Sequence, residues 1–324
     1  MKLDRTMELD KQSETDSKDH RNDQLFHYAV KSCAIFVLVI MLAASFSMLW
    51  SGKEAFQTFG FSFIWNSSWD PIGKNFGALV PIYGTLVTSF IAMLIAVPVS
   101  FGIAIFITNI APKWIRTPIS TAIELLAGIP SIIYGMWGLF VFVPFMADNV
   151  YPWVDEHMGS WPIVGPLFQG PPIGLGMLTA GIVLSIMIIP FVSSIMREVF
   201  STVPTPLIES AYAVGNTTWE VIWDIVLPYT RSSVLGGIFL GLGRALGETM
   251  AVTFVLGNAH MLSLSLLEPG NSISATIANE FTEADSTIYL SSLMALGFIL
   301  FVVTFIVLAI ARVMLGRLSR REGA

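Results

Sequence analysis

Two charged residues, Arg244 and Glu248, lie inside a long apolar stretch. This stretch, Leu235–Leu256 (LGGIFLGLGRALGETMAVTFVL), is long enough to cross a bilayer, which takes about 20 apolar residues in a helix. A charge at the centre of such a span costs about 2.5–3.5 kcal/mol or more. Four residues apart on a helix, the two side chains lie on one face and can pair. They predict either a structural ion pair between helices or a polar station on a substrate path.

The composition of the 324-residue chain indicates an integral membrane protein. Hydrophobic residues make up 54% and charged residues only 12%, against about 25% charged residues in soluble domains. The net charge of −6 gives no indication of a nucleic-acid partner. The single cysteine, Cys33, excludes an internal disulfide, and the four histidines lack close ligand spacing. We therefore expect no metal and no other cofactor.

Six apolar runs are long enough to span a membrane, and the second contains Pro98, which predicts a kink or a tilt. We expect an all-α fold: a polytopic bundle of six transmembrane helices in a permease domain 28–324. Residues 1–27, which precede this domain, are polar and their charges alternate in sign, so we expect them to form a cytoplasmic tail. The predicted spans are Tyr28–Leu49, Leu79–Ile110, Ile119–Met146, Gly174–Met196, Val234–Leu256 and Ile288–Val313.

Lysines and arginines are concentrated in alternate connections between these spans. They precede the first span, follow the second, lie between the fourth and fifth, and fill the end of the chain. Because positive residues gather on the cytoplasmic side, we expect both termini to be cytoplasmic. The connections on the opposite side are nearly free of lysine and arginine, with only Lys53 and Lys74 in the first of them. They are Ser51–Ala78, Ala147–Ile173 and Gly257–Thr287.

The predicted cytoplasmic segment 198–230 is amphipathic. Thr205 followed by Pro206 predicts a helix start with Thr205 as the N-cap, and Gly215 predicts its left-handed end. A second amphipathic helix is expected over Thr218–Val226, with Trp219, Ile222, Trp223 and Val226 on one side and Pro228 ending it. A plain surface connector is the alternative.

This segment resembles the "EAA" loop of the permeases of ATP-binding-cassette (ABC) importers, which implies the type I importer permease fold. The matching positions are Glu209, Ala211, Gly215 and the later Ile225–Pro228 (IVLP), with Ser210 in place of an alanine. In that family the helix docks on the ATP-binding subunit. The resemblance therefore implies that Glu209, Ser210, Ala211 and Gly215 couple the spans to ATP hydrolysis.

A second resemblance concerns the substrate. The stretches Glu124–Gly135 (ELLAGIPSIIYG) and Gly241–Ala251 (GLGRALGETMA) are similar to the permeases of phosphate importers, in particular to the first of their two permease subunits. The resemblance places Arg244 and Glu248 in the phosphate path. It also implies a second permease subunit, a dimer of ATP-binding subunits and an extracytoplasmic phosphate-binding protein as partners, in the lipid of a bacterial inner membrane.

No phosphate-binding loop of the form GxxxxGK[ST] occurs in the chain. We therefore expect a transporter subunit rather than an enzyme, with ATP hydrolysis in a partner. Two alternatives remain at this point. One is a sulfate or molybdate permease of the same superfamily, which would share the EAA pattern. The other is an ATP-independent secondary anion transporter, with Arg244 and Glu248 as an ion relay.

Three further features carry weaker predictions. Glu124 follows Thr121 at the spacing of a capping box, which favours a helix start over a transport role. Gly128, Pro130 and Gly135 predict a weakened or broken helix at membrane depth, for which a packing kink is the alternative. The glycines of the fifth span favour close packing against a partner permease.

Overall fold

The computed structural model describes the backbone of residues 2–320 and the side chains of residues 23–313. Within this part of the chain every regular element is a helix, and the chain divides into two compact units that meet at Ser51 and Gly52. The first unit is the single helix α1 (Lys2–Ser51), in which Asp23–Ser51 is long and apolar enough to span a membrane. The predicted division at residue 27 stays a prediction.

The second unit begins with a short helical pair and the long helix α4. Its elements up to the middle of the chain are α2 (Lys53–Phe59), α3 (Ser62–Trp65), α4 (Leu79–Ile105), a wide turn η1 (Phe106–Ile110), α5 (Lys113–Ala127), α6 (Ser131–Trp137), η2 (Gly138–Phe142), α7 (Val143–Phe145), η3 (Met146–Val150), α8 (Tyr151–Met158) and η4 (Gly165–Leu167).

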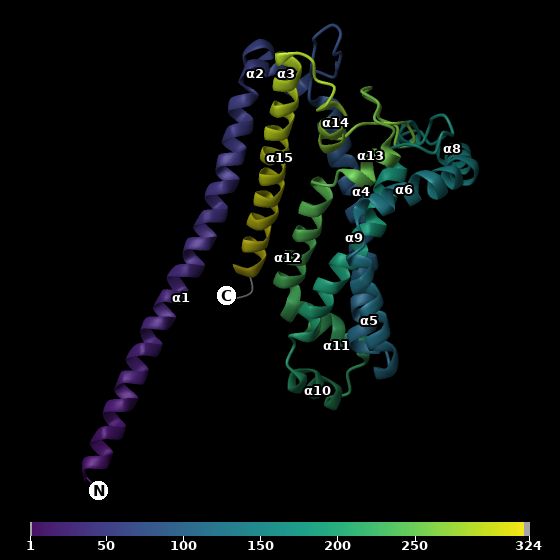
Figure 1. Ribbon diagram of the computed structural model, residues 1–324. Coiled ribbons are helices and arrows are strands. Elements are labelled where there is room, and N and C mark those ends of the chain that lie inside the picture. The colour runs from purple at the N-terminus through teal and green to yellow at the C-terminus, as the bar shows by residue number, and fades with distance from the viewer. Residues whose placement is uncertain (1, 321–324) are drawn as a thin grey trace. The chain divides into compact units, whose positions relative to one another are not determined.

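The remaining elements contain the amphipathic segment and the last spans. They are α9 (Met177–Ser201), α10 (Thr205–Ala213), α11 (Thr218–Val221), a wide turn η5 (Ile222–Val226), α12 (Leu227–Leu246), α13 (Met250–Leu256), α14 (Ile273–Glu280) and α15 (Thr287–Arg320). Within this unit α10 and α11 lie at one end, and α8 and α14 lie towards the other (Figure 1). Within this unit, the amphipathic connection after α9 therefore lies at the end opposite to the connections that contain α8 and α14.

Six helical segments are long and apolar enough to cross a membrane, as predicted. Four agree with the expected spans within a few residues, but the third and fifth are displaced. The third is Ser131–Met158 because the helix breaks before Ser131, and the fifth is Thr218–Leu246. The expectation that Pro228 ends a helix was wrong. Pro228 lies in the first turn of α12, directly after the wide turn η5. Proline has no backbone N–H, and at this position the helix does not need that donor.

The centre of the second unit is the packing of α4 against α9. Small residues permit a close approach, since Ala92, Ala96 and Ala180 are fully buried, and a Cβ atom on Gly181 would lie 2.5 Å from Ile91 Cγ2. The Ser100 hydroxyl also donates a hydrogen bond across the pair to the Ile189 carbonyl oxygen, at 3.1 Å. Close backbones and polar cross-links of this kind hold helices together in lipid, where hydrophobic exclusion does not act.

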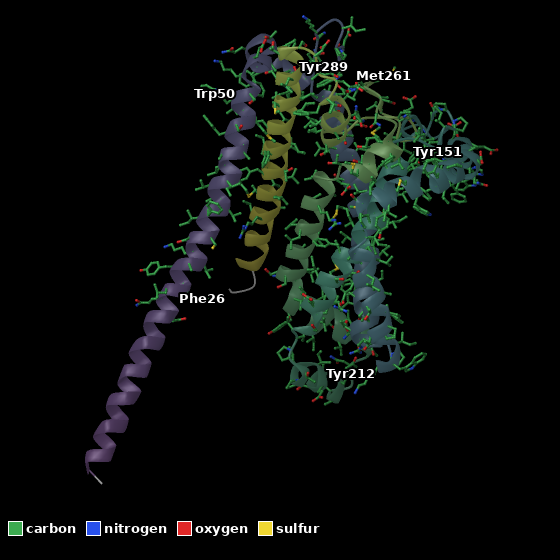
Figure 2. All side chains as sticks on the ribbon, viewed as in Figure 1. Phe26, Trp50, Tyr151, Tyr212, Met261 and Tyr289 are labelled. Carbon is green, nitrogen blue, oxygen red and sulfur yellow. The ribbon has the colours of Figure 1, made fainter. Side chains whose placement is uncertain are left out.

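A second buried cluster surrounds one carboxylate, that of Glu280 at the end of α14. Its Oε2 accepts hydrogen bonds from Trp69 Nε1 at 2.7 Å and the Tyr289 hydroxyl at 2.6 Å. Its Oε1 lies 2.6 Å from His260 Nε2. Burial by itself raises the pKa of Glu280, but the hydrogen bonds from His260, Tyr289 and Trp69 outweigh it, so the pKa lies below its ordinary value. The cluster ties α14 to α15 and to the loop before α4. Figure 2 shows Tyr289 and Met261 at this end of the unit.

Replacing the carboxylate should destabilise this end of the protein. We expect Glu280→Gln to lower the free energy of unfolding by about 1–3 kcal/mol at pH 7, because buried donors lose a charged acceptor. The native contribution is present above the ordinary carboxyl pKa and disappears as the pH falls through the lowered folded-state pKa. The difference between the native chain and the variant should therefore shrink in acid.

The measurement is thermal unfolding of the purified full-length protein in detergent across a pH series. Glu283→Gln is the matched control, since Glu283 is exposed three residues further on. Equal unfolding temperatures for Glu280→Gln and the native chain at pH 7 would contradict this account of the cluster.

Candidate functional site

Arg244 lies in the last turn of α12 and has no acidic partner among the described residues. Its Nε is buried without a hydrogen-bond acceptor, whereas its terminal nitrogens are not among the buried, unpartnered atoms. The guanidinium carbon lies 5.2 Å from the ring centroid of Phe191 on α9. Tyr134 of α6 is also within electrostatic range of this charge. The guanidinium therefore contacts an aromatic ring and keeps donors for another ligand.

Glu248 does not lie on the same helix as Arg244, so the predicted pairing was wrong. Helix α12 ends at Leu246, Gly247 forms a turn, and α13 begins only at Met250. The Glu248 Oε1 instead accepts a hydrogen bond from the Ala251 backbone N–H at 3.3 Å, at the start of α13. The carboxylate satisfies a free backbone donor at a helix start, and the break places it outside the helical register that pairing needs.

A second break lies in the segment GIPSIIYG, as predicted. Helix α5 ends at Ala127, and α6 begins at Ser131 directly after Pro130. The Tyr134 hydroxyl spans the gap by donating a hydrogen bond to the Leu126 carbonyl oxygen at 3.0 Å. The same oxygen also accepts a hydrogen bond from the Ile129 backbone N–H at 3.2 Å. The tyrosine therefore adds a side-chain hydrogen bond across the break, and such side-chain bonds help interrupted helices to persist at membrane depth.

The two breaks belong to helices that pack closely on one another. A Cβ atom on Gly135 of α6 would lie 3.0 Å from Ala251 Cα of α13 and 2.8 Å from a Phe254 ring carbon. Only glycine permits this approach of the backbones. The packing of α6 on α13 and of α12 on α9 brings a broken-helix region, one guanidinium and two aromatic rings into one part of the molecule. A cation with free N–H donors can bind an oxyanion there.

The predicted coupling segment contains α10, which ends as the sequence indicated. Gly215 has a φ angle of +102°, in the left-handed region that favours glycine. Glu209 and Ser210 are exposed, and the Ser210 hydroxyl donates to the Pro206 carbonyl oxygen at 2.6 Å. Ala211 is buried against the same chain. Figure 2 shows Tyr212 of α10 at the end of the unit opposite to Tyr289.

The start of α10 and the helix that follows differ from the prediction. Helix α10 begins at Thr205 itself, and the Thr205 side chain forms no capping bond. The next helix begins with a capping box, in which Thr217 and Glu220 bond each other's backbone N–H groups. It continues into α12, burying Ile222 and Val226 while Trp219 and Trp223 stay exposed. The four residues thus do not form one buried face, because η5 changes the helical period.

Comparison with known families identifies the architecture. Residues 96–321 match the family described as binding-protein-dependent transport system inner membrane component. The chain belongs to this family. It is 63% identical over 308 residues to the phosphate transport system permease protein PstC of Xylella fastidiosa strain Temecula1, covering 95% of each chain. The corresponding protein of Mesorhizobium japonicum is 56% identical, over 93% of this chain and 92% of that protein.

Solved structures support the same fold at low sequence identity. A chain of the bacterial alginate ABC transporter, in complex with an alginate pentasaccharide-bound periplasmic protein, is 18% identical to this chain. The match has a TM-score of 0.61 and covers 93% of this chain and 97% of that chain. A chain of the inward-facing MetNI methionine ABC transporter is 17% identical, with a TM-score of 0.51, and the match covers 74% of this chain and 94% of that chain. The protein is thus a multi-pass membrane permease with the ABC-importer fold.

Two glycines of α12 pack inside this permease rather than against a partner. A Cβ on Gly237 would lie 2.9 Å from Ile195 Cγ2, and one on Gly241 would lie 2.6 Å from Val192 Cγ2, both on α9. Gly236, by contrast, has nothing within 4 Å of the added atom. The prediction of close helix packing is confirmed for Gly237 and Gly241, but the neighbouring helix belongs to the same chain.

Glu124 forms an ion pair and is not a helix cap. It lies in the last part of α5, and its Oε1 is 2.6 Å from an Arg197 terminal nitrogen on α9. The helix begins at Lys113, well before Thr121, so the capping spacing was coincidental. The Glu124 side chain is 55% exposed, and exposed pairs contribute about 0–1 kcal/mol.

Phe191 could not be predicted from the sequence, since a phenylalanine in an apolar span has no distinguishing pattern. The cluster around Glu280 could not be predicted either, because its members come from the loop before α4, the segment after α13, α14 and α15. Their separations in sequence give no periodic signal. Only the packing brings these side chains together.

Proposed function

We propose that the protein is the membrane-spanning permease subunit of an ABC importer that moves inorganic phosphate inward. The observation that carries this proposal is the identity of 63% to a phosphate transport system permease over 95% of both chains. A probable phosphate transport system permease of Methanocaldococcus jannaschii is also 35% identical over 84% of this chain. A separate ATP-binding subunit supplies the energy, and an extracytoplasmic binding protein delivers the phosphate.

Arg244 is the residue that we propose to bind phosphate on its path. Phosphate carries one to two negative charges near neutral pH and does not enter hydrocarbon unassisted. A guanidinium stays charged, is weakly hydrated and forks onto phosphate oxygens. The terminal nitrogens of Arg244 are accessible, and none of the described carboxylates pairs with them. Both features support this role, because the donors need no release from an ion pair before phosphate binds.

Glu248 is proposed to keep that binding weak enough for release. It lies at the break between α12 and α13, close in sequence to Arg244, and its carboxylate caps α13 in the present structure. A negative charge near the path repels a bound anion and competes with it for the guanidinium. The site would then alternate between an empty and a loaded state without a strongly bound intermediate.

The exposed surface of α10 is proposed to receive the movement of the ATP-binding subunits. Glu209 and Ser210 face solvent, and Ala211 joins the helix to the core of this chain. The left-handed Gly215 turns the backbone from α10 towards the capping box at Thr217. Because α11 continues through η5 into α12, a displacement of α10 has a short covalent route to the helix that carries Arg244.

The remaining parts of the proposal concern assembly and orientation. We propose a heterodimer with a second permease subunit and a dimer of ATP-binding subunits, in the lipid of a bacterial inner membrane. Both chain termini and α10 would lie on the cytoplasmic side, which the distribution of lysine and arginine supports. The polar segment 1–27 would then be a cytoplasmic tail.

Removing the guanidinium should abolish uptake without preventing assembly. We expect Arg244→Gln to reduce ATP-dependent phosphate uptake by about 100-fold or more, because a buried anion loses its charged, bidentate partner. Arg244→Lys should also fail, since an ammonium lacks the planar fork. The measurement is labelled-phosphate uptake in cells without their own phosphate permease, with co-purification of the partner subunits as the assembly control.

Uptake equal to the native level in Arg244→Gln would contradict the proposed path. Uptake of sulfate or molybdate but not phosphate by the native chain would favour the other oxyanion permeases. Uptake that persists without ATP would favour a secondary transporter.

A bulky residue at Gly215 should uncouple ATP hydrolysis from transport. The φ angle of +102° strains a β-branched side chain, although nothing lies within 4 Å of an added Cβ. We expect Gly215→Val to reduce uptake about tenfold while ATP hydrolysis in the assembled importer changes about twofold or less. Gly236→Ala is the control, because its Cβ enters open space at an ordinary φ. Native uptake in Gly215→Val would refute the coupling role.

A further inference from the structure

The group that holds the Arg244 guanidinium in this structure is an aromatic ring. Two acidic side chains that the sequence offered as intramembrane charges are bonded elsewhere: Glu124 pairs with Arg197, and Glu248 caps the start of α13. The Arg244 Nε is buried and has no acceptor. The contact that the structure does provide is the Phe191 ring, with its centroid 5.2 Å from the guanidinium carbon.

An aromatic partner differs chemically from a carboxylate partner. The attraction between a cation and a ring arises from the negative face of the π system and uses none of the N–H donors. A carboxylate would accept one or two of those donors and neutralise the charge. A guanidinium held by a ring therefore stays fully charged, with its donors available to an incoming oxyanion.

The position of the ring is fixed by the packing of α9 against α12. Gly241, three residues before Arg244, lies against Val192, which adjoins Phe191. Gly237, one turn earlier, lies against Ile195. These two close contacts set the register of the helices, so that Phe191 lies opposite Arg244. If one helix slid along the other, the glycine contacts would be lost and the Phe191 ring would no longer lie beside Arg244.

We propose that Phe191 is a positioning residue for Arg244: its ring holds the guanidinium in the empty permease and leaves its donors free for phosphate. This inference rests on the proposed function, because it assigns to Arg244 the binding of the transported anion. Without the ring, the long side chain is free to reorient or to be captured by Glu248. Phosphate would then bind more weakly, and the free guanidinium would be more reactive towards reagents.

The test is the modification of Arg244 by phenylglyoxal in the assembled importer, quantified by mass spectrometry of its peptide over a phosphate series. We expect Phe191→Leu to raise the half-protecting phosphate concentration by about fivefold or more. Phe191→Tyr, which keeps the ring, should stay within about twofold of the native value. Phe101→Leu is the matched control, since Phe101 contacts Phe200 and Trp223 instead.

Native protection in Phe191→Leu, or an equal loss of protection in Phe191→Tyr, would overturn the inference. If Phe191→Leu assembles poorly, Phe191→Met replaces it as the test variant, because methionine fills a similar volume without a ring. The inference then requires Phe191→Met to lose phosphate protection of Arg244, and native protection would overturn it. The proposed function is tested separately in the native chain. If phosphate does not protect the native Arg244, the proposed path fails; if it does and Phe191→Leu is unchanged, only the role of Phe191 fails.

Discussion

The permanent positive charge of Arg244 inside an apolar helix bundle is the main constraint on the structure around it. Arginine does not lose its proton in a protein, so Arg244 cannot escape the cost of burial by becoming neutral. The structure provides no carboxylate partner for it among the described residues and instead offers a ring, partial access and a helix end. Such an arrangement stabilises an arginine only in part, and it leaves binding capacity that an anion can use.

The breaks in the helices are what make this arrangement possible. Had α12 continued through Glu248, the two charges would have paired and closed the site. The turn at Gly247 places Glu248 outside helix α12. A second interruption, between α5 and α6, breaks the helical backbone before Ser131. The α4–α9 pair, tightly packed through small residues, is the rigid part against which these interrupted helices are held. A rigid centre next to broken helices suits a protein that must alternate between states.

Sequence reasoning succeeded where the signal was local and failed where packing decided. The number of spans, the left-handed Gly215 and the break at Gly128–Pro130 follow from hydrophobicity and from backbone chemistry. The Arg244–Glu248 pair failed because i, i+4 spacing assumes an unbroken helix. The capping role of Glu124 failed because its partner, Arg197, lies 73 residues away in the chain. Phe191 was missed because an aromatic side chain in an apolar span becomes distinctive only once a charge lies beside it.

The most direct measurement is an experimental structure of the assembled importer trapped with phosphate at membrane depth. The account predicts phosphate oxygens within hydrogen-bond distance of the Arg244 terminal nitrogens, next to the break between α12 and α13, with the guanidinium still against Phe191. Phosphate bound away from Arg244, with Arg244 and Glu248 joined in an ion pair, would contradict the account and make the pair a structural link between helices.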